Sequence, residues 1–332
     1  MSGNSATISA KMVADPDASI KKDLGYTILR ELRKKGDGDT WRTVAGPFEA
    51  GNPSFDIALA DGEGNSVNAS GLYRLVTLIV PKCDLSITNE IPATNIIGVL
   101  EVKSPTASTV TAVPWKQLAS DPAKAVDITV NNYVAGLNLS TGDAVYALDA
   151  DARTYRMWKV KADGAWEMVT TVSGAADGSY KITEAGAPDV VSMSCGGAAW
   201  VQRANTSKPY FLVGQYDESA FTVEVPGATD KGPGLALIAN PSFSGVKLND
   251  LDWSKYAIDP RDTIRIVENG VQTTLWYNNK NNKWGHYESK TVEWFGATFV
   301  TSQFVPYEKA IPSGTGFFYF RAASSGFTFT WK

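Results

Sequence analysis

The chain has 332 residues, of which 43% are hydrophobic and 20% charged, and its formal net charge is -4. This length is sufficient for two or three domains with cores of ordinary size, and this composition excludes a disordered chain. The lack of a basic excess argues against nucleic-acid binding, and no apolar run reaches the roughly 20 residues that a membrane helix needs. We therefore expect a globular protein with no nucleic-acid partner and no membrane span.

Strand patterns recur along the chain with turn residues between them, whereas helical periodicity is almost absent. This pattern is typical of β-sandwiches and barrels. In a first unit, residues 1–84, we expect strands at 7–13, 25–30, 40–44, 54–59 and 72–80, which favour an immunoglobulin-like or fibronectin-like β-sandwich. Its N-terminal segment carries no charge and suits pairing along the sheet edge of a neighbouring molecule. The residues of this candidate assembly strand are Ala6, Thr7, Ile8, Ser9 and Ala10.

Two further units follow, at residues 85–226 and 227–332. In the first of them we expect strands at 95–102 and 108–113 and a three-stranded meander at 144–148, 154–160 and 166–171. In the second, after the linker-like residues 226–234, we expect a strand at 235–239, a meander at 263–267, 272–277 and 283–288, and closing strands at 316–321 and 327–331. Asn269-Gly270 is the strongest hairpin signal in the chain.

The two later units resemble each other at matching positions, which predicts an internal repeat of about 118 residues. Each contains an Asp before the first meander strand, two Trp residues eight apart, and a tail with a Gly, an aromatic residue and an Arg. The matched positions are Asp143, Trp158, Trp166, Gly196, Trp200 and Arg203 in one unit and Asp262, Trp276, Trp284, Gly314, Phe318 and Arg321 in the other. We therefore expect two related modules of β-sandwich or β-barrel type.

The repeated residues suit structural roles. Asp143 and Asp262 each precede a strand by one residue, where a carboxylate can accept backbone N–H groups of the turn. The Trp pairs are expected to stack across a hairpin as cross-strand neighbours. The Gly-rich tails are expected to be tight turns rather than phosphate loops, because no helix follows them.

Catalytic and metal-binding patterns are not found in the sequence. His286 is the only histidine and has no recognisable nucleophile or acid pair. Cys83 and Cys195 could form one disulfide or remain two free thiols. Calcium is the metal least excluded, because Asp15-Pro16-Asp17 and Asp149-Ala150-Asp151 place oxygen atoms in turns, although turn formation explains both. We expect no enzymatic activity, no cofactor and no metal.

Aromatic residues offer the best remaining functional signal, because sugar rings stack on aromatic faces. The candidate sugar platform in the third unit consists of Trp253, Tyr256, Tyr277 and Trp294. Burial against a neighbouring unit would explain the same residues.

The third unit resembles a tandem β-module of secreted bacterial surface proteins, on the residues Asn240-Pro241, Leu248-Asn249-Asp250-Leu251, Trp276-Tyr277, Trp284 and the run 311–321. The resemblance implies a secreted or cell-surface location, with any signal peptide already removed, and transfers no functional residue. We expect a structural subunit that polymerises with itself into a filament or surface layer. The alternative is a carbohydrate-binding adhesin that acts as a monomer.

Overall fold

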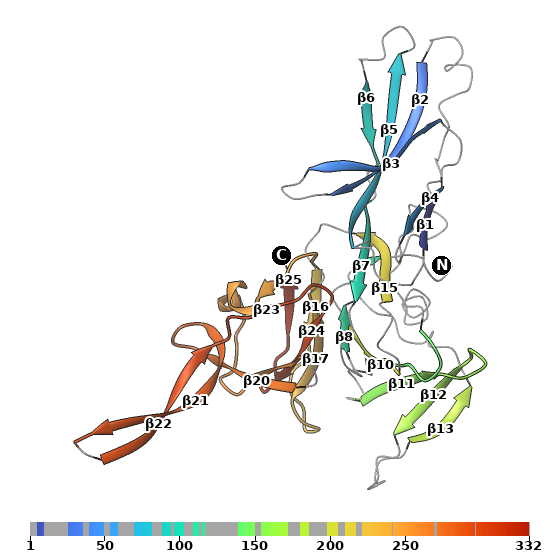
Figure 1. Cartoon of the computed structure of the whole chain (residues 1–332). Coiled ribbons are helices and arrows are strands. Elements are labelled where there is room, and N and C mark those ends of the chain that lie inside the picture. The colour runs from blue at the N-terminus through green and yellow to red at the C-terminus, as the bar shows by residue number, and fades with distance from the viewer. Residues whose placement is uncertain are drawn as a thin grey trace.

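The structure is a computed structural model that describes residues 5–9, 26–35, 40–49, 54–58, 70–81, 88–93, 96–102, 109–112, 115–116, 139–149, 154–171, 180–185, 198–204, 210–216, 221–240, 242–268, 271–295 and 297–331. Within these ranges the chain forms antiparallel strands, the 3₁₀ turns η2 (Leu248–Asp250) and η3 (Trp253–Lys255), and no α-helix. The predicted all-β fold class is confirmed (Figure 1).

The first part of the chain contributes to a seven-stranded sheet in the order β3-β2-β5-β7-β15-β9, with β6 also paired to β5. Its strands are β2 (Tyr26–Lys35), β3 (Trp41–Glu49), β5 (Gly71–Pro81), β6 (Asn89–Pro92), β7 (Ile96–Val102), β9 (Trp115–Lys116) and β15 (Tyr210–Tyr216). Val76, Leu78 and Val80 alternate along β5 and pack with Leu29 of β2. Since β7 and β15 join this sheet, strand pairing runs across the predicted boundary at residue 84.

Two six-stranded sheets have the same strand order. One is ordered β13-β12-β11-β10-β14-β8 and the other β22-β21-β20-β19-β24-β17. The strands of the first are β8 (Thr109–Ala112), β10 (Ala144–Asp149), β11 (Thr154–Val160), β12 (Trp166–Thr171), β13 (Tyr180–Ala185) and β14 (Ala198–Gln202). Those of the second are β17 (Gly234–Ala239), β19 (Thr263–Glu268), β20 (Val271–Asn278), β21 (Lys283–Trp294), β22 (Ala297–Pro306) and β24 (Gly316–Arg321).

Three two-stranded sheets complete the described fold. They pair β1 (Ser5–Ser9) with β4 (Ser54–Ala58), β16 (Phe221–Val225) with β25 (Phe327–Trp331), and β18 (Val246–Lys247) with β23 (Ala310–Ile311). Strand β16 precedes the predicted boundary at residue 226, yet it pairs along its whole length with the last strand. We call the second six-stranded sheet, together with the pairs β16–β25 and β18–β23 that pack on it, the C-terminal sandwich, and it therefore includes residues from both sides of that boundary.

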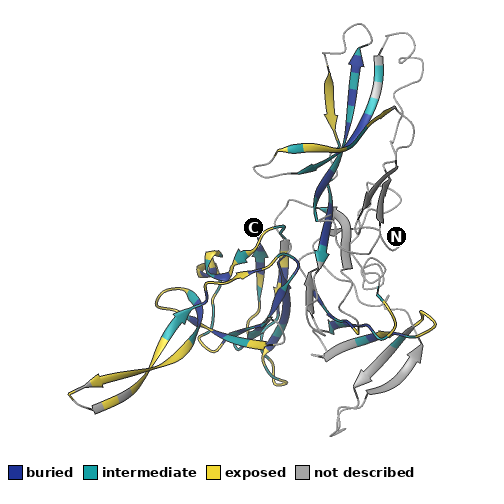
Figure 2. Ribbon diagram, in the orientation of Figure 1, coloured by how far each residue is buried: buried dark blue, intermediate teal, exposed yellow. Residues whose placement is uncertain are grey.

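An aromatic core fills the C-terminal sandwich. Trp253 of η3 stacks on Phe329 of β25, with ring centroids 5.1 Å apart, and meets Trp284 of β21 edge to face at 5.3 Å. The buried cluster draws on the second six-stranded sheet, on β16, β25 and β23, and on Leu248 and Trp253 of the 3₁₀ turns. Burying such large rings contributes to stability through removed apolar area and through ring geometry. Figure 2 shows the buried strands of this part and the exposed hairpin that extends from it.

The two six-stranded sheets contact each other through one face. Ala198 and Trp200 of β14 pack against Leu237 and Ala239 of β17 and Phe318 of β24. The rings of Trp200 and Phe318 stack with centroids 5.4 Å apart. Strands β17 and β24 are therefore buried on both faces, one toward their own core and one toward the neighbouring sheet.

Candidate functional site

The candidate assembly strand forms most of β1. Ala6 pairs with Ile57 and Ile8 with Phe55 in an antiparallel ladder with β4, all within one chain. Ala10 lies outside the described residues. Because β1 and β4 form a sheet of only two strands, β1 has a single neighbouring strand among the described ones.

The candidate sugar platform is wrong for two of its four residues. Trp253 is 1% exposed and Tyr277 7% exposed, because both rings point into the aromatic core of the C-terminal sandwich. Tyr256 is half-buried against Phe327, with ring centroids 4.8 Å apart. The side chain of Trp294 lies outside the described side chains. The platform was predicted from large aromatic side chains alone. A hydrophobic core buries the same side chains, so residue type does not separate a sugar platform from a core.

The predicted Trp stacking across the hairpins is also wrong. Trp158 faces Met168 and Trp166 faces Val160 in one hairpin, while Trp276 faces Gly285 in the other. Trp158 is 1% exposed but Trp276 is 37% exposed, so these two residues occupy opposite faces of their sheets. Successive side chains on a strand alternate between faces, so a shift of one residue reverses the direction of a ring.

Asp262 is the centre of a buried polar cluster at the start of β19. Its carboxylate is fully buried and accepts the guanidinium of Arg321 at 2.6 Å, the hydroxyl of Tyr319 at 2.8 Å and the backbone N–H of Ala322 at 2.6 Å. The N–H of Asp259 donates to the same carboxylate at 3.1 Å. Burial raises the pKa of Tyr319, and the Asp262 charge raises it further, so this hydroxyl stays a donor at neutral pH.

Asp143 has a similar arrangement at the start of β10, with the hydroxyl of Ser140 rather than of a tyrosine as a donor. Its fully buried carboxylate accepts the backbone N–H groups of Ser140 at 2.9 Å and Ala204 at 2.7 Å, and the Nε of Arg203 lies 3.0 Å from Oδ2. The expectation that both acids accept turn N–H groups is confirmed. Each carboxylate is also the partner of a buried arginine, which explains why the tails of both units carry one. We call these two groups the Asp–Arg clamps.

His286 lies on β21 at the base of the exposed hairpin, where its Nε2 is 2.9 Å from Glu288 Oε1. No cluster of three or more His, Cys, Asp or Glu that could hold a metal ion occurs in the described ranges. Cys83, Cys195 and the acids Asp15, Asp17 and Asp151 lie outside those ranges.

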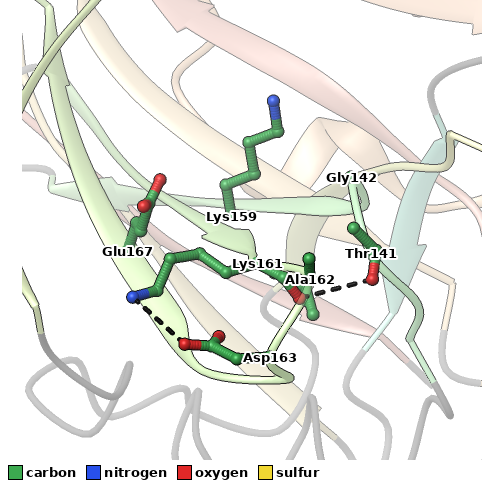
Figure 3. A pocket seen from close by; sticks show the side chains of 8 residues that line it. Thr141, Gly142, Lys159, Lys161, Ala162, Asp163 and Glu167 are labelled. Carbon is green, nitrogen blue, oxygen red and sulfur yellow. Dashed lines mark hydrogen bonds and ion pairs between the residues drawn. The ribbon is translucent and has the colours of Figure 1, made fainter.

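A shallow depression of about 500 Å³ lies beside the turn between β11 and β12 (Figure 3). It is lined by Thr141, Gly142, Lys159, Val160, Lys161, Ala162, Asp163 and Glu167. Lys161 reaches toward Asp163, with its Nζ 3.7 Å from Oδ2, and the Ala165 N–H holds the pKa of Asp163 below its usual value. This open surface of mixed charge supplies no activated nucleophile or base.

Strands β21 and β22 form a hairpin that projects from the second six-stranded sheet (Figures 1 and 2). Only Lys283–Gly285 of β21 pair with β20, whereas β21 and β22 pair over ten positions from Gly285–Pro306 to Trp294–Ala297. Tyr287 is 54% exposed and Val300 74% exposed. An outward-facing two-stranded arm of this kind buries little of its own surface.

Comparison of the chain with protein-family models, curated proteins and solved structures gives no match. In the described part, no helix is long and apolar enough to cross a membrane.

Proposed function

We propose that the chain is a structural subunit that assembles with copies of itself into an extracellular filament or surface layer, through exchange of strand β1. The observation that carries this proposal is the pairing of β1 with β4, the one strand that neighbours it among the described residues. A sheet of two strands is marginally stable in water, because it has little apolar face to bury. Strand β1 is therefore an element that a neighbouring copy can replace, whereas the pairs β16–β25 and β18–β23 contribute to the buried core of the C-terminal sandwich.

Exchange between copies costs no backbone contact. A β1 strand from a neighbour forms the same ladder with β4, with Ala6 opposite Ile57 and Ile8 opposite Phe55. Residues 10–25 separate β1 from β2 along the chain, a length of 16 residues that spans at most about 58 Å. Donation from each copy to the next is a head-to-tail contact, and such contacts build open filaments when the rotation does not close a ring.

We also propose that the two six-stranded sheets derive from one repeated unit. Their strand orders correspond along the chain, and an Asp–Arg clamp stands at the same place in each. Trp166 and Trp284 also correspond, since each pairs with the last part of the preceding strand. A repeated rigid module suits a building block, and this proposal requires no catalytic group.

Deletion of residues 1–10 tests the strand exchange. Electron micrographs of the full chain are expected to show ordered polymers, and those of the truncated chain to show none. Deletion of residues 1–4 is the matched control, because it shortens the chain but leaves β1 intact. Polymers of unchanged form from the chain lacking residues 1–10 would remove strand exchange as the mechanism, and a full chain that stays monomeric at high concentration would remove self-assembly.

A further inference from the structure

Strand β22 is an uncharged edge strand of ten residues. Its sequence, ATFVTSQFVP, is rich in β-branched and aromatic residues and contains no Asp, Glu, Lys or Arg. It is the last strand of its sheet, so one row of its backbone N–H and C=O groups has no strand partner among the described residues. Natural proteins usually protect such edges with charges, bulges or short strands, because an open edge is a template for another chain.

Other strands of the two six-stranded sheets are protected by charge or by burial, whereas β22 is not. Along the projecting part of β21 stand Glu288, Lys290 and Glu293, whose charges oppose the approach of a further strand. In the other six-stranded sheet, the strand at the matching edge is β13, which carries Lys181 and Glu184. Strand β17, at the opposite end of the second sheet, is uncharged but buried on both faces. Strand β22 thus combines length, exposure and absence of charge.

We propose that β22 pairs edge to edge with β22 of a second copy of this chain, in an antiparallel two-stranded seam between two projecting hairpins. An identical strand suits this edge because neither copy brings a charge that would lie opposite a like charge. Pairing of identical antiparallel strands places the two copies about a two-fold axis, so the same residues contribute from both sides. This inference deepens the proposed self-assembly by naming a second contact, which does not use β1.

The two-fold geometry fixes which residues meet. Residues opposite each other in an antiparallel pair lie on the same face of the sheet. If the two-fold axis passes at Thr301, Val300 of one copy lies opposite Ser302 of the other. If the axis passes at Val300 or at Ser302, that residue lies opposite its own counterpart. Both are exposed, and their partners across the hairpin are Thr291 and Ser289 of β21. A charge at these positions in one copy therefore meets the same charge in the other.

Charge substitution in the full chain tests this seam. The double variants V300K/S302K and V300E/S302E each place like charges opposite one another, and each is expected to weaken association by roughly tenfold or more. An equimolar mixture of the two variants is expected to restore association, now as Lys–Glu pairs. Sedimentation velocity measures the association, and native mass spectrometry identifies the mixed dimer.

The control variant places two lysines on β21, the strand that pairs with the other edge of β22. S289K/T291K alters the cross-hairpin partners and leaves β22 unchanged, so this variant is expected to associate as the wild type does. Circular dichroism and thermal unfolding verify that all three variants are folded. A wild-type chain without association, unaltered association of the β22 variants, or a failure of the mixture to associate would each overturn the proposal. Deletion of residues 1–10 is expected to leave this seam intact, so failure of strand exchange and failure of the seam are separable.

Discussion

Replacement of Asp262 by Ala is expected to destabilise the C-terminal sandwich severely. The change leaves the guanidinium of Arg321, whose side chain is 2% exposed, without its carboxylate partner. It also leaves the hydroxyl of Tyr319 and the N–H of Ala322 without the acceptor that each now uses. Removal of one partner of a buried ion pair costs about 3–5 kcal/mol. A loss of this size lowers the Tm of a domain of roughly 100 residues by more than about 10 °C.

Urea unfolding followed by tryptophan fluorescence measures this loss, because Trp253 and Trp284 lie in the core beside the clamp. D163A is the matched control, since it removes an exposed carboxylate that is paired with Lys161 and accepts the N–H of Ala165, and only a small loss, well below that of D262A, is expected. The double variant D262A/R321M is expected to recover part of the lost stability, because it also removes the buried arginine charge that the single variant leaves without a partner. A loss of less than about 1 kcal/mol in D262A, the range of exposed pairs, would refute the reasoning.

Two further predictions concern the tryptophans and the alkaline limit of the fold. W284A is expected to cost about 3–5 kcal/mol in urea unfolding because Trp284 is fully buried, whereas W276A is expected to cost no more than about 1 kcal/mol. Equal losses would show that the faces of these strands are misassigned. Burial raises the pKa of Tyr73 to about 12, so its protonated form favours the folded state. Stability is therefore expected to fall from pH about 10 to about 12, and Y73F should reduce this fall in the urea midpoints at pH 9 and 11.5; an undiminished fall in Y73F would contradict the role of Tyr73.

Local sequence patterns predicted many of the strands and the use of the two clamp acids, because both depend on residues close along the chain. They did not predict β13, β16 or β22. Asp143 and Asp262 precede strands, and their turn N–H partners lie three residues away. The arginine partners were matched to each other by the repeat, but their contacts with the acids were not predicted. Arg321 is 59 residues from Asp262, and only the order of strands β19 and β24 brings the two together.

The spacing of the tryptophans in the sequence did not predict which face of the sheet each ring occupies. Residues 150–153 separate β10 from β11, whereas only residues 269–270 separate β19 from β20. The two hairpins therefore differ in length, and Trp158 corresponds by register to Leu275 rather than to Trp276. An equal Trp spacing concealed this shift, and a shift of one residue exchanges the core face of a strand for its outer face.

The stacked rings of Trp200 and Phe318 join two positions that occupy the same place in their respective sheets. Trp200 lies opposite Tyr146 of β10, three residues after Asp143, and Phe318 lies opposite Arg265 of β19, three residues after Asp262. A contact between counterparts means that any change in ring size on one side must be accommodated by the other. The indole and the phenyl ring fill the same space between the two sheets, so a substitution at either position alters the contact of both sheets at once.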